Sequence, residues 1–308
     1  MGLSGTHLVV GATPYGVTLA ARLRLLGEET MLVGRRLKPA IELLRFEGWN
    51  QLITLNIKPL TAVDVSHVKI AFFTVRPYDL EGCFDRYLPY LPKGIPIVAV
   101  CRGAIEGTIE RGRKKFPSFA WRIGCCQFQT VHHGLGIHEL KSNQNRFFWG
   151  PLNPHDQDHQ NVEQDLAAKD QQGFFSLYQP MRPMVRKTWL FDVVINTICA
   201  FHEYAKIEDL FKDTRELHDV FQEAYKLGKE LWGAWEQTPE QLFSDLVNTI
   251  SVNGQLEAPM NLDLKRGART LNDYFAYIAH GHRGFDRLCQ LSEEIKNKSK
   301  FSARTRSP

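Results

Sequence analysis

The sequence lacks several patterns that would assign a protein to a class at once. It has no run of about 18 apolar residues, the length that a membrane-spanning helix needs. Its six cysteines form no CxxC pair and show no metal-ligand spacing. The N-terminus has no basic start followed by an apolar stretch, the pattern of a secretory signal. We therefore expect neither a membrane partner nor a metal centre, and we place the protein in the cytoplasm.

The net charge of the chain is also small. The formal net charge is +4 over 308 residues, which is too small and too dispersed to predict nucleic-acid binding. The clearest basic run is the C-terminal KNKSKFSARTRSP, in which little can be buried. With 43% hydrophobic and 23% charged residues, the composition is that of a globular protein, and the small positive charge is compatible with small anionic ligands.

The first half of the chain alternates short apolar runs with helical patterns, which is typical of a parallel sheet with crossover helices. THLVVG predicts a first strand, and the helix YGVTLAARLRLLG ends on Gly27, a usual C-cap. ETMLVG predicts a second strand, and KIAFFTV and IPIVAVC predict strands buried on both faces. Weaker strand patterns, FAWRIGCCQFQTV and FFSLY, flank the helical stretch NVEQDLAAKD. We expect an α/β fold with a Rossmann-type parallel sheet in its N-terminal domain.

Strand patterns stop near Met181. The runs that follow have helical periodicity and are KTWLFDVVINTICAFHEYA, ELHDVFQEAYKLGKELWGAW, PEQLFSDLVNTI and TLNDYFAYIAHGHRGFDRLCQLSEEI. Because PMRP at 180–183 breaks regular structure, we place the domain boundary there. The expected organisation is a sheet domain over 1–180, an all-helical domain for substrate or dimer contacts over 181–296, and a disordered basic tail over 297–308.

The turn after the first strand, in HLVVGATPYG, is an incomplete dinucleotide-binding fingerprint. Gly11 and Gly16 supply the first and third glycines of GxGxxG, which make the tight turn and pack helix on strand. Thr13 replaces the middle glycine, and its hydroxyl could donate to a phosphate oxygen. Pro14 is tolerated at the first helical position, although one phosphate donor is lost. The turn is weakened but not destroyed.

The second strand ends in VGRR. An acidic residue there would accept the ribose hydroxyls of NAD, whereas Arg35 and Arg36 suit a 2′-phosphate through charge-assisted hydrogen bonds. NADPH therefore fits this site better than NADH. The alternative is that both arginines are simply solvated at the end of the strand.

A polar stripe runs along an otherwise apolar helix in the second half. Thr188, Asp192 and Asn196 recur every four residues in KTWLFDVVINTICAF, so they share one helical face. Unpaired polar groups in apolar surroundings are costly, so this stripe must meet water, partners or a ligand. Two interpretations stay open: the lining of a ligand cleft, or a network of hydrogen bonds between helices.

Two stretches of the second half, RKTWLFDVVINT and PMNLDLKRGARTLND, are eroded forms of patterns that belong to one family. Its helical domain begins with W-x-K-x-x-x-N-x-x-x-N-P and ends with S-M-x-x-D-x-x-x-G-R-x-T-E-I-D. With these motifs and the N-terminal turn, the chain resembles the ketopantoate reductases from about Thr6 to about Ile295. The resemblance implies NADPH as cofactor, a 2-keto acid as the anionic substrate, and often a homodimer.

On the cofactor side, the resemblance implies that Arg35 recognises the 2′-phosphate, alongside Gly11, Thr13 and Gly16. Arg76 of FTVRPYD replaces the lysine usually found after the third core strand. The family's Q-N-G, whose Asn lies near nicotinamide and substrate, is here CRG at 101–103. Arg102 is therefore a candidate for binding an anionic substrate.

The catalytic side departs further from the family. The family's lysine, which protonates or polarises the keto oxygen, aligns with Thr188, and Lys187 points about 100° away on a regular helix. Asp192 and Asn196 stand at the two Asn positions. The substrate-binding Ser falls on Pro259 and the acid of T-E-I-D on Leu271, whereas the kept positions are Met260, Asp263, Thr270 and Asp273.

Hydride transfer to a 2-keto acid creates an alkoxide, which needs a cation or proton donor. Three alternatives stay open. The first is a reductase with altered groups, in which the catalytic candidates are Lys187, Asp192, Asn196 and Asp273 and the substrate-binding candidates are Arg102, Thr188 and Asp263. The second is an NADPH-binding sensor without turnover. The third is an interaction scaffold without a cofactor.

Overall fold

The protein is described here by a computed structural model that covers residues 5–34, 44–46, 53, 55–59, 63–127, 130–132, 138–140, 146–152, 160–171 and 173–304. The chain divides into two compact units. The first comprises Met1–Cys101 and Ile105–Arg182, and the second comprises Arg102–Ala104 and Pro183–Pro308. Residues 102–104 thus belong with the second unit, although the first unit flanks them in sequence.

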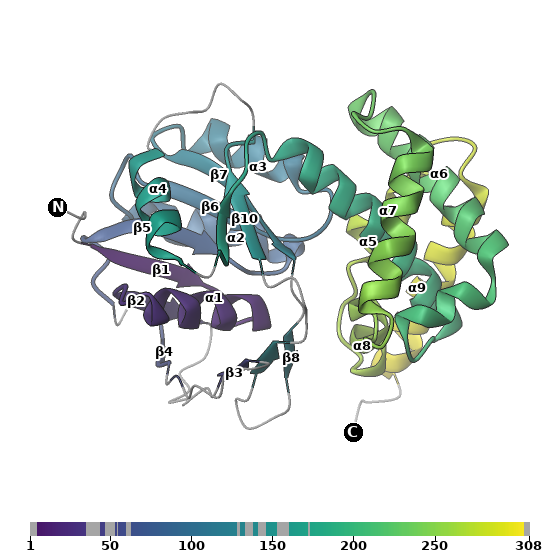
Figure 1. Ribbon diagram of the computed structural model, residues 1–308, viewed down its shortest axis with the longest axis horizontal. Coiled ribbons are helices and arrows are strands. Elements are labelled where there is room, and N and C mark those ends of the chain that lie inside the picture. The colour runs from purple at the N-terminus through teal and green to yellow at the C-terminus, as the bar shows by residue number, and fades with distance from the viewer. Residues whose placement is uncertain are drawn as a thin grey trace. The chain divides into compact units, whose positions relative to one another are not determined.

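The first unit is built on an eight-stranded sheet with the order β11-β10-β7-β6-β5-β1-β2-β4. Its strands are β1 (Thr6–Val10), β2 (Thr30–Val33), β4 (Ile57–Lys58), β5 (Val68–Phe73), β6 (Pro96–Val100), β7 (Ala120–Gln127), β10 (Arg146–Gly150) and β11 (Phe175–Leu177). All neighbours are parallel except β7 and β10. The Rossmann-type sheet expected from the apolar runs is confirmed (Figure 1). A second sheet has the order β3-β9-β8, with β3 (Leu44–Phe46), β8 (Thr130–His132) and β9 (His138–Leu140).

Helices cover both faces of the large sheet. They are α1 (Pro14–Leu25), α2 (Pro77–Tyr87) with the short η2 (Leu88–Tyr90), α3 (Glu106–Lys115) and α4 (Gln160–Lys169). On one face, Val9 and Phe72 cluster with buried residues of α1 and α4. On the other, the Phe73 ring meets Phe84 of α2 at 5.1 Å, and Phe84 meets Trp121 of β7 at 4.9 Å, both edge to face. Burial on both faces is why these strands read as continuous apolar runs.

Strand β10 was not predicted. RFFWG pairs antiparallel with β7, and Phe147 and Trp149 of this strand are fully buried. The alternate residue Phe148 points to the opposite face, where its ring lies 6.1 Å from that of Tyr178. A run of three aromatic residues hides this alternation, because side chains on both faces are apolar.

The second unit is helical, as expected. Its elements are α5 (Arg182–His202), η3 (Ile207–Lys212), α6 (Thr214–Trp232), α7 (Pro239–Asn253), α8 (Pro259–Lys265), η4 (Asn272–Tyr274), η5 (Ala276–Gly281) and α9 (Asp286–Arg304). Every residue of α5 from Trp189 to Ala200 is buried, so the other helices gather around it (Figure 1). No helix in the described part of the chain is both long and apolar enough to cross a membrane.

Two predictions for this unit were wrong. TLNDYFAYIAHGHRGFDRLCQLSEEI is not one helical stretch: η4 and η5 precede α9, and Gly284 at φ +84° separates them from it. The tail predicted to be disordered from residue 297 is helical as far as Arg304. Lys298 explains part of this, because its Nζ donates to Phe201 O at 2.6 Å and to Glu203 Oε1 at 2.8 Å. A long basic side chain can thus be held against a neighbouring helix end without being buried itself.

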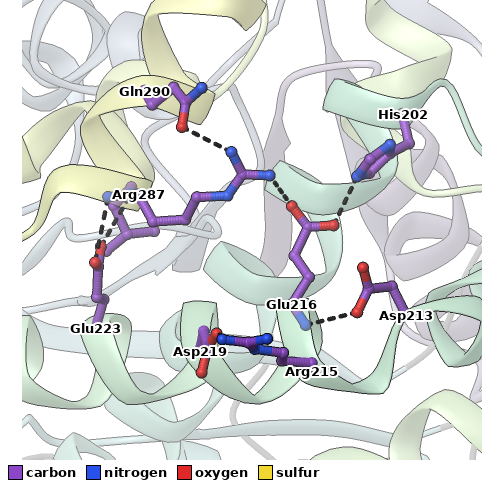
Figure 2. A network of polar contacts seen from close by, with 9 residues as sticks. His202, Asp213, Arg215, Glu216, Asp219, Glu223, Arg287 and Gln290 are labelled. Carbon is purple, nitrogen blue, oxygen red and sulfur yellow. Dashed lines mark hydrogen bonds and ion pairs between the residues drawn. The ribbon is translucent and has the colours of Figure 1, made fainter.

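Glu216 of α6 ties three helices together around the C-terminal end of α5 (Figure 2). One of its carboxylate oxygens contacts Nε2 of His202 at 2.6 Å, and the other accepts from the guanidinium of Arg287. Glu223, two turns further along α6, accepts from the backbone N–H of Arg287 at 3.2 Å and of Leu288 at 2.8 Å. A carboxylate at the first N–H groups of a helix satisfies donors that have no partner within the helix. Helix α9 therefore starts where α6 holds it.

A cluster of titratable side chains surrounds the buried carboxylate of Glu28 in the first unit. The Glu28 carboxylate contacts Nζ of Lys69 and of Lys169, each at 2.8 Å, and Nδ1 of His7 at 3.4 Å. Burial alone would raise the pKa of Glu28, but the two ammonium groups hold it below its usual value. Burial, with Lys69 next in effect, lowers the pKa of His7 from 6.5 to about 4. His7 is therefore neutral in the folded protein at neutral pH.

This cluster makes the first unit sensitive to acid. Between pH 6.5 and about 4 the unfolded chain binds a proton at His7 that the folded chain does not. The free energy of unfolding should therefore fall as the pH drops through this window, by up to about 3 kcal/mol. Urea unfolding at a series of pH values should show His7→Gln losing most of this pH dependence. His218→Gln, at an exposed histidine, should keep it, and an unchanged slope in His7→Gln would contradict the assignment.

Candidate functional site

The turn between β1 and α1 keeps the geometry of a nucleotide-binding turn at its two glycines. Gly11 has φ +107°, and a Cβ there would lie 2.9 Å from Cγ1 of Val75. A Cβ at Gly16 would lie 2.0 Å from the backbone oxygen of Gly11 and 2.4 Å from Oγ1 of Thr74. Helix α1 therefore starts in direct contact with the turn and with the end of β5, which only glycine permits.

Thr13 is the N-cap of α1 and closes the turn from within. Its hydroxyl donates to Thr74 O at 2.7 Å and accepts from Gly16 N at 3.2 Å. The hydroxyl of Thr74 in turn donates to Gly11 O at 2.8 Å and lies 3.1 Å from Val10 O. The hydroxyl proton of Thr13 is thus already used, which corrects the expectation that it donates to a phosphate. The first turn of α1 contains no acidic side chain, so its N–H groups could bind an anion there.

Arg76 and Arg35 are the other predicted cofactor residues. Arg76 is the N-cap of α2, with an extended backbone and Pro77 directly after it. Its charge acts on the neighbouring Cys101 thiol, whose pKa is raised overall by burial. Cys101 Sγ also lies 3.0 Å from Val75 O, so this thiol is protonated and is no nucleophile. Arg35 lies outside the described residues.

Arg102, which is half-buried, and the buried Asp192 form an ion pair in the second unit. Nη1 of Arg102 donates to Oδ1 of Asp192 at 2.9 Å, and the two side chains are 20% and 8% exposed. Oδ2 of Asp192 is buried and has no hydrogen-bond partner among the described residues. Burial raises the pKa of Asp192, whereas the Arg102 charge and the amide of Asn196 act to lower it. Arg102 thus opposes the effect of burial, which nevertheless keeps the pKa of Asp192 above its ordinary value.

The chain holds Arg102 in place through the residues next to it. Gly103 has φ +106°, and a Cβ there would lie 2.8 Å from Cβ of Tyr274. The oxygen of Tyr274 accepts from Ala104 N at 3.3 Å and from Nε1 of Trp189 at 3.1 Å. The roles of Trp189 and Tyr274 were not predicted from the sequence. The signal that was available is the glycine directly after Arg102, since a strand end followed by Arg-Gly indicates a fixed turn.

Asn196 is fully engaged by its neighbours. Its Nδ2 donates to Asp192 O at 3.0 Å and lies 3.4 Å from Oδ1 of the same residue. Its Oδ1 accepts from Met260 N at 3.1 Å, in the first turn of α8. Because the N-cap residue of α8 is Ala258, which has no polar side chain, Asn196 supplies the missing acceptor. Of the two interpretations of the polar stripe, Asn196 fits the network between helices.

Of the remaining predicted site residues, Lys187 and Asp273 are held by other partners. Lys187 forms an ion pair with Asp245 of α7 at 2.5 Å, and Gln237 also donates to that carboxylate, at 3.2 Å. Thr188 is half-buried one turn before Asp192, and Asp263 is buried on α8. Asp273 is half-exposed and pairs with Arg269 at 3.0 Å. Helix α5 is unbroken at its start, so Lys187 stays on the face that meets α7.

In the described part of the chain, no group of three or more His, Cys, Asp or Glu side chains is placed so that it could hold a metal ion. The two positions at which the motifs are most eroded are also explained. Pro259 is the first residue of α8, and Leu271 is buried with 6% exposure. Pro259 starts a helix and Leu271 lies in the core, so neither position supplies a polar side chain.

No protein-family model and no curated protein matches the sequence. Solved structures do match. A ketopantoate reductase from Ralstonia eutropha JMP134 has a TM-score of 0.82 at 13% identity, over 97% of this chain and 99% of that one. A 2-dehydropantoate 2-reductase from Geobacter metallireducens GS-15 has 0.79 at 15%, over 95% and 99%. D-mandelate dehydrogenase with NADH and anilino(oxo)acetate has 0.79 at 14%, over 97% and 99%. The chain thus has the fold of the ketopantoate reductases, which confirms the resemblance seen in the sequence.

The two hydrogen bonds of the Thr13 hydroxyl should contribute to folding stability rather than to ligand binding alone. Thr13→Val keeps the shape of the side chain but removes both bonds, and we expect it to lower the free energy of unfolding by about 1 to 2 kcal/mol. Thr13→Ser keeps the hydroxyl and should stay within about 0.5 kcal/mol of the wild type. Urea denaturation of the two variants without any ligand checks this, and equal stabilities would show that the cap is not needed.

Proposed function

We propose that the protein is an NADPH-dependent oxidoreductase that reduces a small 2-oxo acid to the 2-hydroxy acid. The observation that carries the proposal is the Arg102–Asp192 pair, which begins two residues after β6 of a Rossmann-type sheet. A guanidinium binds the carboxylate of such a substrate, and a carboxyl group can donate a proton to its oxo oxygen. The similar structures act on related compounds, since they include ketopantoate reductases and a D-mandelate dehydrogenase with bound anilino(oxo)acetate.

The residues of the first unit fit a dinucleotide. Gly11 and Gly16 let α1 start in contact with the turn and the end of β5, and the start of α1 would offer its dipole to the pyrophosphate. Arg76, at the start of α2, adds a positive charge. Arg35 is the residue that we expect to recognise a 2′-phosphate, and for that reason we propose NADPH rather than NADH.

The chemistry needs one hydride, one proton and the oxo acid. When bound, the reduced nicotinamide would supply the hydride to the carbonyl carbon. A C–H bond forms, the π bond of the carbonyl breaks, and the oxygen takes the proton to become the hydroxyl group. Arg102 orients the substrate carboxylate, and Asp192 delivers the proton. Asn196 holds the Asp192 backbone and α8 in position, and it is therefore a positioning residue.

Lys187 has no part in this proposal, because Asp245 holds its ammonium group. Neither does Asp273, which pairs with Arg269 at the surface. Thr188 and Asp263 stay candidates for contacts to the rest of the substrate. A protein that binds NADPH without turnover is the second candidate, and the absence of a lysine one turn before Asp192 favours it.

The cofactor assignment predicts that NADPH binds at least about tenfold more tightly than NADH in a calorimetric titration. Arg35→Ser should remove most of this preference by weakening NADPH alone, because NADH has no 2′-phosphate for the arginine to bind. Arg113→Ser, at the C-terminal end of α3, is the control and should leave both affinities unchanged. Saturable binding with no oxidation of NADPH by any 2-oxo acid would favour a protein that binds NADPH without turnover. If neither nucleotide bound, the interaction scaffold without a cofactor would be the alternative that stays.

The substrate assignment predicts that Arg102→Ala lowers kcat/KM by about 100-fold or more and leaves NADPH affinity within about twofold. Arg102→Lys keeps the charge but not the planar fork, so part of the activity should return, mainly through a lower KM than in Arg102→Ala. NADPH oxidation by a panel of 2-oxo acids supplies the measurement, with Arg111→Ala in an exposed pair with Glu81 as the control. Unchanged turnover in Arg102→Ala would remove this residue from the site.

A further inference from the structure

The contact between Arg102 and Asp192 uses one oxygen of the carboxylate only. Nη1 of Arg102 reaches Oδ1, which also lies 3.4 Å from the amide nitrogen of Asn196. Oδ2 is buried and without a partner among the described residues. A guanidinium and a carboxylate frequently meet through two parallel hydrogen bonds. The contact between Arg102 and Asp192 is therefore less complete than a bidentate pair would be.

The charge of Asp192 depends on Arg102. Burial disfavours the carboxylate, and Arg102 is the charged group that opposes this effect. Helix α8, which Asn196 caps, contributes Asp263, and η4 contributes Asp273; neither is among the groups that shift the pKa of Asp192. Drawing Arg102 away would leave a buried carboxylate without its counter-charge, an arrangement that costs several kcal/mol unless the acid takes up a proton.

A carboxylate ligand can draw Arg102 away. It offers two oxygens in the geometry of the guanidinium fork, whereas Asp192 engages the arginine through one. Once the ligand holds the arginine, the neutral acid of Asp192 has an O–H to donate, and Oδ2 is the oxygen that has no other partner to lose.

On these observations, and resting on the proposed function, we propose that Arg102 and Asp192 form a proton-coupled anion site. Arg102 exchanges Asp192 for the carboxylate of a 2-oxo acid, and Asp192 takes up one proton from solvent in the same step. The charge of the site is then the same before and after binding, because the ligand brings one negative charge and the proton one positive charge. The acid that the reaction requires is thereby loaded only when a substrate is present.

This coupling fixes the pH dependence of binding. In the free protein the positive charge of Arg102 lowers the pKa of Asp192. In the complex the ligand carboxylate also interacts with that charge, so the pKa of Asp192 rises. A group that gains proton affinity on binding makes the ligand bind best at low pH. The dissociation constant should therefore rise towards tenfold per pH unit above the point where free Asp192 ionises.

The test uses the full-length protein and oxamate, an unreactive analogue of a 2-oxo acid, with NADP⁺ present throughout so that no hydride is available. Titration calorimetry in two buffers of different ionisation enthalpy, from about pH 6 to about pH 9, counts the protons taken up. We expect uptake to rise to about one proton per oxamate in the wild type. Asp192→Asn should bind oxamate with no proton uptake and with a flat pH profile, because Asn cannot titrate.

Matched variants separate the pair from general effects. Asp85→Asn makes the same change in the exposed ion pair with Lys115, and its proton uptake should equal that of the wild type. Oxamate binding without proton uptake at any pH in the wild type would overturn the proposal, as would full uptake in Asp192→Asn. Failure of the wild type to bind oxamate at all would overturn it too.

The outcome is distinguishable from that of the proposed function. Proton-linked binding of oxamate in a protein that oxidises no NADPH would support this site and refute the reductase. Turnover of 2-oxo acids together with proton-free oxamate binding would do the reverse, since catalysis would then draw its proton from another source.

Discussion

A carboxylate buried on the central helix of the second unit is the constraint on which the site depends. Asp192 lies on α5, where every neighbour from Trp189 to Ala200 is buried, so its charge must be met by a group from another segment. Arg102 comes from residues 102–104, which belong with this unit although the flanking chain forms the other one. Gly103 and Tyr274 hold that short segment against the helices. The position of the arginine is therefore set by packing, and the arginine opposes the effect of burial on the pKa of Asp192.

Much of the fold could be predicted because the central strands and the long helices have clear hydrophobic patterns. Strands β1, β5 and β6 are buried on both faces, and each is a continuous apolar run in the sequence. Helices α5, α6 and α7 have long periodic patterns. Strand β10 was missed because its aromatic residues are apolar on both sides. The segment before α9 looked helical because its apolar residues are correctly spaced, but Gly284 adopts a conformation that interrupts a helix.

The site was only partly predictable, because spacing places a side chain on a face but does not say what it meets. Arg102 and Asp192 were identified separately, and their pairing across ninety positions of sequence is visible only in three dimensions. Asn196 proved to cap α8, a short helix that the sequence did not predict. Lys187 forms an ion pair with Asp245 of α7, and no pattern in the sequence predicted a contact between these two residues. The hydroxyl of Thr13 turned inward to the end of β5, which depends on how closely α1 approaches that strand.

The glycines of the first turn have a consequence for how such a motif should be understood. At Gly16 the obstacle to a side chain is the main-chain oxygen of Gly11, 2.0 Å from where a Cβ would stand, and no substitution elsewhere removes a main-chain atom. Position 13 is different, because Thr13 meets its neighbours through a hydroxyl that other residues can supply. In a lineage that ceased to bind nucleotides, the middle position would be free to drift, but Gly16 would persist for as long as the sheet folds. The presence of the first and third glycines therefore indicates how the helix packs on the strand. Whether such a turn binds a nucleotide is indicated by the residues between and beyond these glycines.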